Sequence, residues 1–141
     1  MRSLVMITII STLFLQGCNG YPPPLDPKRF DNTTWRATSP FDSHNYLQFT
    51  LYKKNNLLAL YGKGGCHKIT GVMRIEGIRL YLATPLYDSY EGSCTIQKDR
   101  MIKLYISAIK AGLIFDSGDL YTSDGGVAFF HRPSQPLKTP N

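Results

Sequence analysis

The sequence has few cysteines and no apolar run long enough to cross a membrane as a helix. Three cysteines in 141 residues are too few for a zinc site with four thiolate ligands or for a domain held together by many disulfides. The most apolar run, residues 4–15, would rise only about 18 Å as a helix, at 1.5 Å per residue. The hydrocarbon core of a bilayer is about 30 Å thick, so this run is typical of an export signal and not of a membrane span.

Recognisable catalytic and metal-binding patterns are also absent. The chain contains no G-x-S-x-G nucleophile motif, no H-E-x-x-H zinc motif and no phosphate-binding glycine loop. Its histidines, His44, His67 and His131, lie too far apart in the chain for two of them to share one helix face as metal ligands. We therefore expect a non-enzymatic protein without a metal ion and without any cofactor other than covalent lipid.

The N-terminus has the features of a lipoprotein signal. Arg2 precedes the apolar run, which ends in Leu15-Gln16-Gly17-Cys18. This segment resembles the bacterial lipobox, in which a small residue precedes the cysteine that is acylated. The resemblance implies that residues 1–17 are removed and that Cys18 carries diacylglycerol and an N-terminal acyl chain. Two or more such chains hold a protein on a membrane almost permanently.

The residue after that cysteine indicates which membrane holds the lipid anchor. Asn19 stands where an aspartate commonly signals retention at the inner membrane, so we expect an anchor in the outer membrane and a domain on its periplasmic face. This compartment excludes nucleic acid as a partner. Membrane lipid is expected through the anchor, and an envelope protein is the expected binding partner.

The rest of the chain reads as one folded domain with two short extensions. A composition of 43% hydrophobic and 18% charged residues is too apolar for a disordered chain. Residues 18–29 contain four prolines and are expected to form the lipidated N-terminus and an extended tether. Residues 30–132 are the expected domain, and the proline-containing residues 133–141 are an expected flexible tail.

Within the domain, a two-residue hydrophobic period dominates and changes once to a helical period. Residues 95–111 carry polar side chains along one face and are expected to form an amphipathic helix that ends at Gly112. The cluster Gly62, Gly64 and Gly65 is expected to end one strand and permit a bulge. One helix among many short strands predicts an α+β, mostly β fold, an incomplete (cracked) antiparallel β-barrel closed by that helix. The expected strands are 34–39, 46–52, 57–61, 69–75, 78–82, 113–115, 120–122 and 127–131.

Two cysteines remain once Cys18 is lipidated. Cys66 and Cys94 form an even pair in an oxidising compartment, so a disulfide between them is expected. The alternative is a reactive thiol at Cys66 assisted by the adjacent His67. Neighbouring strand residues point to opposite faces, and no C-x-x-C motif is present, which favours the disulfide.

Large aromatic side chains are frequent and lie on both faces of the strand 46–52. A strand with two apolar faces must have both covered, so either the helix covers one face or a groove remains for an apolar guest. The plainer interpretation is that the tyrosines pack with their hydroxyl groups at the rim. The candidate groove and partner-binding residues are Tyr46, Phe49, Tyr52, Leu58, Leu60, Tyr87, Tyr90, Met101, Leu104 and Tyr105.

These residues together resemble a known family. Trp35, the segment Gly65-Cys66-His67-Lys68-Ile69-Thr70-Gly71, the second cysteine Cys94 and a helix ending at Gly112 are similar to the META domain of HslJ-like heat-shock lipoproteins. His67 stands where that family usually has asparagine. The resemblance implies a small barrel on an envelope stress lipoprotein without a dedicated client.

The same layout is similar to the MxiM-type pilotins of type III secretion. That resemblance implies a cracked barrel whose apolar groove escorts a secretin subunit to the outer membrane, with residues 85–93 at the lip of the groove. We take a secretin pilotin as the most concrete functional hypothesis and an HslJ-like lipoprotein as its alternative. A third hypothesis, an inhibitor of a hydrolase such as lysozyme, would need a projecting polar loop, for which only residues 63–68 are a candidate.

Overall fold

The structure, a computed structural model, describes residues 23–39 and 42–133. The expected signal peptide, the lipidation site Cys18 and residues 134–141 of the expected tail lie outside the described residues. Within the described part of the chain, no helix has the length and apolar character needed to cross a membrane.

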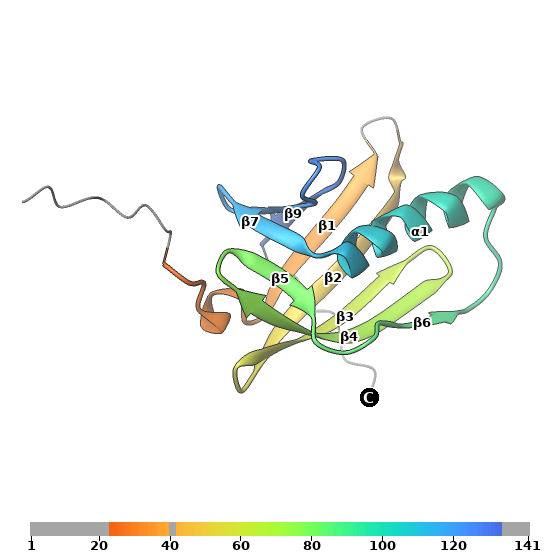
Figure 1. The fold of residues 1–141 in the computed structure, drawn as a ribbon. Helices are drawn as coiled ribbons and strands as arrows, with labels where there is room; N and C mark the ends of the chain where they lie inside the picture. Colours follow the sequence, from red (N-terminus) through yellow and green to blue (C-terminus); the bar gives the residue numbers. More distant parts are fainter. Residues whose placement is uncertain (1–22, 40–41, 134–141) are drawn as a thin grey trace, which may run out of the picture.

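The described strands form one antiparallel sheet that closes on itself, as Figure 1 shows. Eight of them follow the order β3-β2-β1-β9-β8-β7-β5-β4, and a further pairing of β3 with β4 completes the ring. The shortest pairings in the ring have two residue pairs each. Between β5 and β7 these are Arg79 with Ile114 and Leu80 with Leu113, and β8 and β9 pair over the same length. The expected fold, a mostly β antiparallel barrel closed by one helix, is confirmed. The ring strands are β1 (Thr33–Ser39), β2 (Asp42–Lys54), β3 (Leu57–Gly64), β4 (His67–Glu76), β5 (Arg79–Leu82), β7 (Leu113–Asp116), β8 (Asp119–Tyr121) and β9 (Ala128–Arg132).

A ninth strand was not expected from the sequence. Strand β6 (Tyr87–Tyr90) pairs with the first half of β4, from His67 to Thr70, while β5 pairs with the second half. Residues 87–90 show no apolar alternation, because three of the four side chains are exposed. The segment expected to form a groove lip is therefore an edge strand.

The single described α-helix, α1 (Ile96–Ala111), begins and ends at local signals in the sequence. The Thr95 hydroxyl accepts a hydrogen bond from the Lys98 backbone N–H at 3.3 Å. At the other end Gly112 has a φ of 97°, a conformation that favours glycine. The helix packs against β2 and β5, strands that are not neighbours in the ring, and Figure 1 shows it passing in front of β1 and β2. Its inward face therefore covers the barrel interior. That face consists of Ile102, Tyr105, Ile106, Ala108 and Ile109.

The barrel interior is filled by side chains. Phe49 from β2 and Phe129 from β9 meet with their ring centroids 5.1 Å apart, and Tyr105 of the helix lies 6.4 Å from Phe129. Burying each large apolar side chain contributes about 1.5–3 kcal/mol, so this core is the main source of stability. Phe49, Leu58 and Leu60, which were expected to line a groove, are fully buried in it. This corrects the sequence hypothesis, because these side chains cannot contact a partner.

The segment before β1 also differs from expectation. Pro27–Phe30 forms a short 3-10 helix whose first turn is capped by Asp26, and the Leu25 N–H donates to the Gly77 carbonyl oxygen at 3.1 Å. Phe30 is buried and meets Phe115 edge to face at 5.2 Å. Residues 25–29 therefore pack on the barrel, although the sequence assigned them to an extended tether.

The glycine cluster has a different role from the one expected. Gly62 and Gly64 lie inside β3, and the pairing with β4 runs without a register shift, so the expected bulge is wrong. A Cβ atom on Gly62 would lie 2.7 Å from Ile69 Cγ1 and 2.9 Å from Phe49 Cβ, which shows that β3 lies too close to its neighbours for a side chain there. Only Gly65 marks the turn, with a φ of 54°.

Candidate functional site

The ten residues predicted to form one groove are not brought together. Tyr46 lies under the Arg36 guanidinium at 3.9 Å, and Tyr52 packs against Tyr61 with their rings 5.9 Å apart. Tyr87 and Tyr90 are exposed on β6. Only three of the ten, all on α1, line a common apolar hollow: Met101, Leu104 and Tyr105.

This hollow, here called the helix groove, lies between α1, the end of β1 and β9. It has a volume of about 490 Å³, within the range of about 300–1,000 Å³ that is usual for binding pockets. Leu104 on one wall is 53% exposed and Phe130 on the other is 44% exposed. Large apolar side chains gathered around a hollow are a stronger indication of binding than a single exposed one. The groove is lined by Thr38, Ser39, Met101, Leu104, Tyr105, Gly125, Gly126, Val127, Ala128 and Phe130.

The chemistry of the helix groove is that of a binding surface. Its described lining contains no acidic, basic or thiol side chain, so no nucleophile and base face each other there. The sequence pointed to Met101 and Leu104 but missed Phe130 and Val127. A prediction of these two residues would have needed the placement of β9 beside the helix.

The predicted disulfide is present. Cys66 and Cys94 are bonded, with their Cα atoms 5.9 Å apart, a separation usual for disulfides. The bond joins the turn between β3 and β4 to the residue before the helix cap. Because both thiols are consumed, the alternative of a reactive thiol at Cys66 is wrong.

A buried polar cluster lies beside the disulfide. His67 is only 2% exposed, and its ring contacts carboxylates at both nitrogens: Nδ1 lies 2.8 Å from Asp88 Oδ1, and Nε2 lies 2.8 Å from Asp99 Oδ1. Asp99 in turn pairs with Lys103 at 2.8 Å, and the His67 ring meets Tyr90 edge to face at 5.2 Å. The histidine therefore joins β4 to both β6 and α1.

The electrostatics of this cluster favour a charged imidazole. Burial alone would lower the pKa of His67, but the hydrogen bonds and charges of Asp99 and Asp88 outweigh it and raise the pKa above its ordinary value. Hydrogen bonds from Lys103 and His67 hold the pKa of Asp99 below its ordinary value. With both ring nitrogens occupied by carboxylates, His67 is placed as a structural link. Among residues 23–39 and 42–133, no group of three His, Cys, Asp or Glu side chains is arranged to hold a metal ion.

The loop required by the inhibitor hypothesis is not a projecting one. Lys63 and Lys68 are paired across the β3–β4 ladder, and only Gly65 and Cys66 form the turn between the strands. The segment 63–68 is therefore a tight hairpin end.

Comparisons with known proteins support the fold and not a function. No protein-family model and no curated protein matches the chain. An NMR structure of a protein from Burkholderia xenovorans is similar, with a TM-score of 0.55 and 17% sequence identity, over 80% of this chain and 92% of that one. At this identity the similarity shows a shared fold only.

Proposed function

We propose that this protein is a non-enzymatic lipoprotein of the outer membrane that holds an apolar segment of an envelope protein in its helix groove. In its most concrete form, it is a pilotin that escorts a type III secretion secretin. The observation that carries the proposal is the pair of exposed side chains, Leu104 and Phe130, on facing walls of a hollow without charged lining.

The physical basis is the removal of apolar surface from water on both partners. Each large apolar side chain that moves from water into the groove contributes about 1.5–3 kcal/mol. Two or three such anchors from one segment give a useful affinity after the cost of association is subtracted. The groove is flanked by a helix and by β9, which is hydrogen-bonded on both sides by β1 and β8. The segment is therefore recognised by its side chains and not by strand addition.

The test compares two substitutions on one helix. Leu104→Glu places a charge in the groove, whereas Ile96→Glu adds the same charge at a site that is 72% exposed and outside the groove lining. Glutamate is a good helix former, so both variants should fold with unchanged melting temperatures. We expect Leu104→Glu to abolish site-specific cross-linking to the secretin and to reduce secretin in the outer membrane, and Ile96→Glu to do neither.

Other results would point elsewhere. Cross-linking of Leu104→Glu at the unsubstituted level would refute the groove as the binding site. Capture of a muramidase in place of a secretin would support the inhibitor hypothesis, and capture of no specific partner by the wild-type protein would favour an HslJ-like role.

The anchor is tested separately with Cys18→Ala. Without acyl chains the domain should fractionate with soluble periplasmic protein, since no other part of the proposal holds it on the membrane. Continued fractionation with the outer membrane would show that Cys18 is not the anchor.

A further inference from the structure

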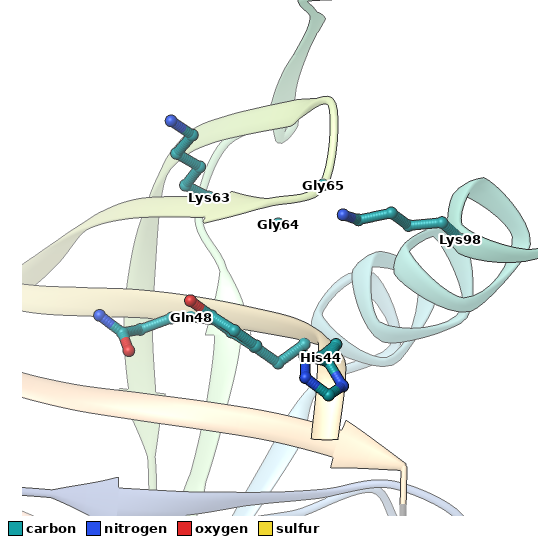
Figure 2. A pocket seen from close by; sticks show the side chains of 7 residues that line it. His44, Gln48, Lys63, Gly64, Gly65 and Lys98 are labelled. Atoms are coloured by element: carbon teal, nitrogen blue, oxygen red, sulfur yellow. The ribbon is translucent and has the colours of Figure 1, made fainter. Parts of the chain in front are cut away.

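A second hollow, here called the basic pocket, lies at the N-terminal end of α1 and shares no lining residue with the helix groove. It has a volume of about 310 Å³. Figure 2 shows it between the first half of β2, the β3–β4 turn and the first turn of α1. Its lining residues are His44, Tyr46, Gln48, Lys63, Gly64, Gly65 and Lys98.

The side chains of this pocket are donors and cations. Lys98 points from the helix toward Gly64 and Gly65, and Lys63 stands at the rim with its amine turned outward in Figure 2. No aspartate or glutamate is among the lining residues that the structure describes. The nearby carboxylate of Asp99 is already bonded to His67 and Lys103. The pocket therefore has a positive potential that its own lining does not neutralise.

Two features hold the pocket in shape before any ligand binds. Arg36 lies over the Tyr46 ring at 3.9 Å and donates to Gln48 Oε1 at 3.1 Å, which leaves the amide N–H groups of Gln48 as the free donors. Gly65 leaves room for the Lys98 stem, because a Cβ there would lie 3.3 Å from Lys98 Cε. The Cys66–Cys94 bond, next to Gly65 and four residues before Lys98, fixes the distance between turn and helix.

We propose that the basic pocket binds a phosphoryl group, with Lys98 as the contacting cation and with Gln48 and Lys63 as polar and charged groups at the rim. A tetrahedral oxyanion has several acceptor oxygens, and an ammonium group such as that of Lys98, which reaches toward Gly64 and Gly65, is a common phosphate ligand. The phosphoryl group could belong to a soluble phosphate or to a phospholipid headgroup, since the chemistry is shared. This site is independent of the function proposed for the helix groove.

The test uses the lipidated chain in neutral detergent micelles and follows the backbone amide resonances of Gly64 and Gly65 by NMR. One arm adds inorganic phosphate, with chloride at equal ionic strength as the reference. The other arm dopes the micelles with phosphatidylglycerol. We expect saturable shifts in at least one arm; phosphate alone would identify a soluble ligand, phosphatidylglycerol alone a lipid headgroup, and both the shared chemistry.

Matched variants distinguish a direct contact with the phosphoryl group from a long-range electrostatic effect. Lys98→Gln should weaken binding about 10-fold or more, because a hydrogen bond to a charged group is lost. Lys63→Gln should weaken it only about two-fold, as for an exposed charge that makes no contact. Lys110→Gln, in the last turn of the same helix, removes the same charge far from the pocket and should change nothing.

The proposal fails if no saturable shift occurs in either arm, or if Lys98→Gln and Lys110→Gln bind alike while the remaining spectrum shows a folded barrel. Leu104→Glu should retain phosphoryl binding. Leu104→Glu therefore tests partner binding in the helix groove, and Lys98→Gln tests phosphoryl binding in the basic pocket. A failure of one proposal can be told apart from a failure of the other.

Discussion

Replacing His67 by glutamine removes the only described side chain that bonds Asp88 and Asp99 together. A protonated imidazole donates to both carboxylates, whereas a glutamine amide at this position can reach one of them at most. A hydrogen bond to a charged group is worth about 1.5–3 kcal/mol. We therefore expect His67→Gln to lower the free energy of unfolding by roughly 1.5–3 kcal/mol at pH 5.5.

The sign of the pH dependence follows from the raised pKa of His67. Its stabilising effect is fully present below the unfolded value of 6.5 and is lost as pH rises through the higher folded pKa. Between these two values the wild-type free energy of unfolding should fall by up to about 1.4 kcal/mol per pH unit for one proton. Asp99 acts in the opposite sense, because its pKa is lowered: its contribution is present above 3.8 and is lost as pH falls further.

The assay is urea denaturation from pH 5.5 to 9 with the disulfide intact. Wild type should lose stability across this range, and His67→Gln should show a flatter profile with the same m-value. His131→Gln is the control, because it removes an exposed histidine that only meets the Trp35 ring edge to face. Parallel profiles for wild type and His67→Gln would show that the buried cluster binds no proton in this range and would refute the argument.

Two further changes test the packing. The double variant Cys66→Ser/Cys94→Ser should lower stability by about 3–4 kcal/mol, the loop-entropy value for cysteines 28 positions apart; an unchanged melting temperature in oxidising buffer would contradict this. Gly62→Ala should cost about 1–3 kcal/mol through overpacking, measured as a shift in the urea midpoint. Adding Ile69→Val should recover part of this loss, since it deletes the Cδ1 atom that would lie 3.0 Å from the new Cβ, and purely additive effects would argue against a steric cause.

Features that depend on neighbours in the chain could be predicted from the sequence. The helix was expected over residues 95–111 and spans Ile96–Ala111, because its first turn is capped by Thr95 and its last turn by Gly112. The disulfide followed from the count of cysteines. Most strands were expected within a few residues of their observed ends, since alternation of apolar and polar side chains is itself a local signal.

Features that depend on residues far away in the chain could not be predicted from the sequence. Strand β6 exists because it pairs with β4, for example Ser89 with Lys68, 21 residues earlier. Nothing within residues 87–90 by themselves indicates a strand. Gly62 reads locally as a strand breaker, yet its role comes from the side chains of Phe49 and Ile69 on adjacent strands. The prediction of one groove lined by ten residues was wrong for the same reason. The two faces of β2 look equally apolar in the sequence whether they pack in the core or bind a partner.

The helix explains why the two hollows can respond differently to one perturbation. Its inward face is fixed in the core by residues such as Ile102 and Ile109, while Leu104 borders the helix groove and Lys98 the basic pocket. The Cys66–Cys94 bond holds the helix at its N-terminal end only. Lys98 follows Cys94 by about one helical turn, whereas Leu104 lies about 15 Å along the axis, at 1.5 Å per residue. Reduction of the disulfide should therefore loosen the basic pocket more than the helix groove, because the core contacts near Leu104 do not depend on that bond.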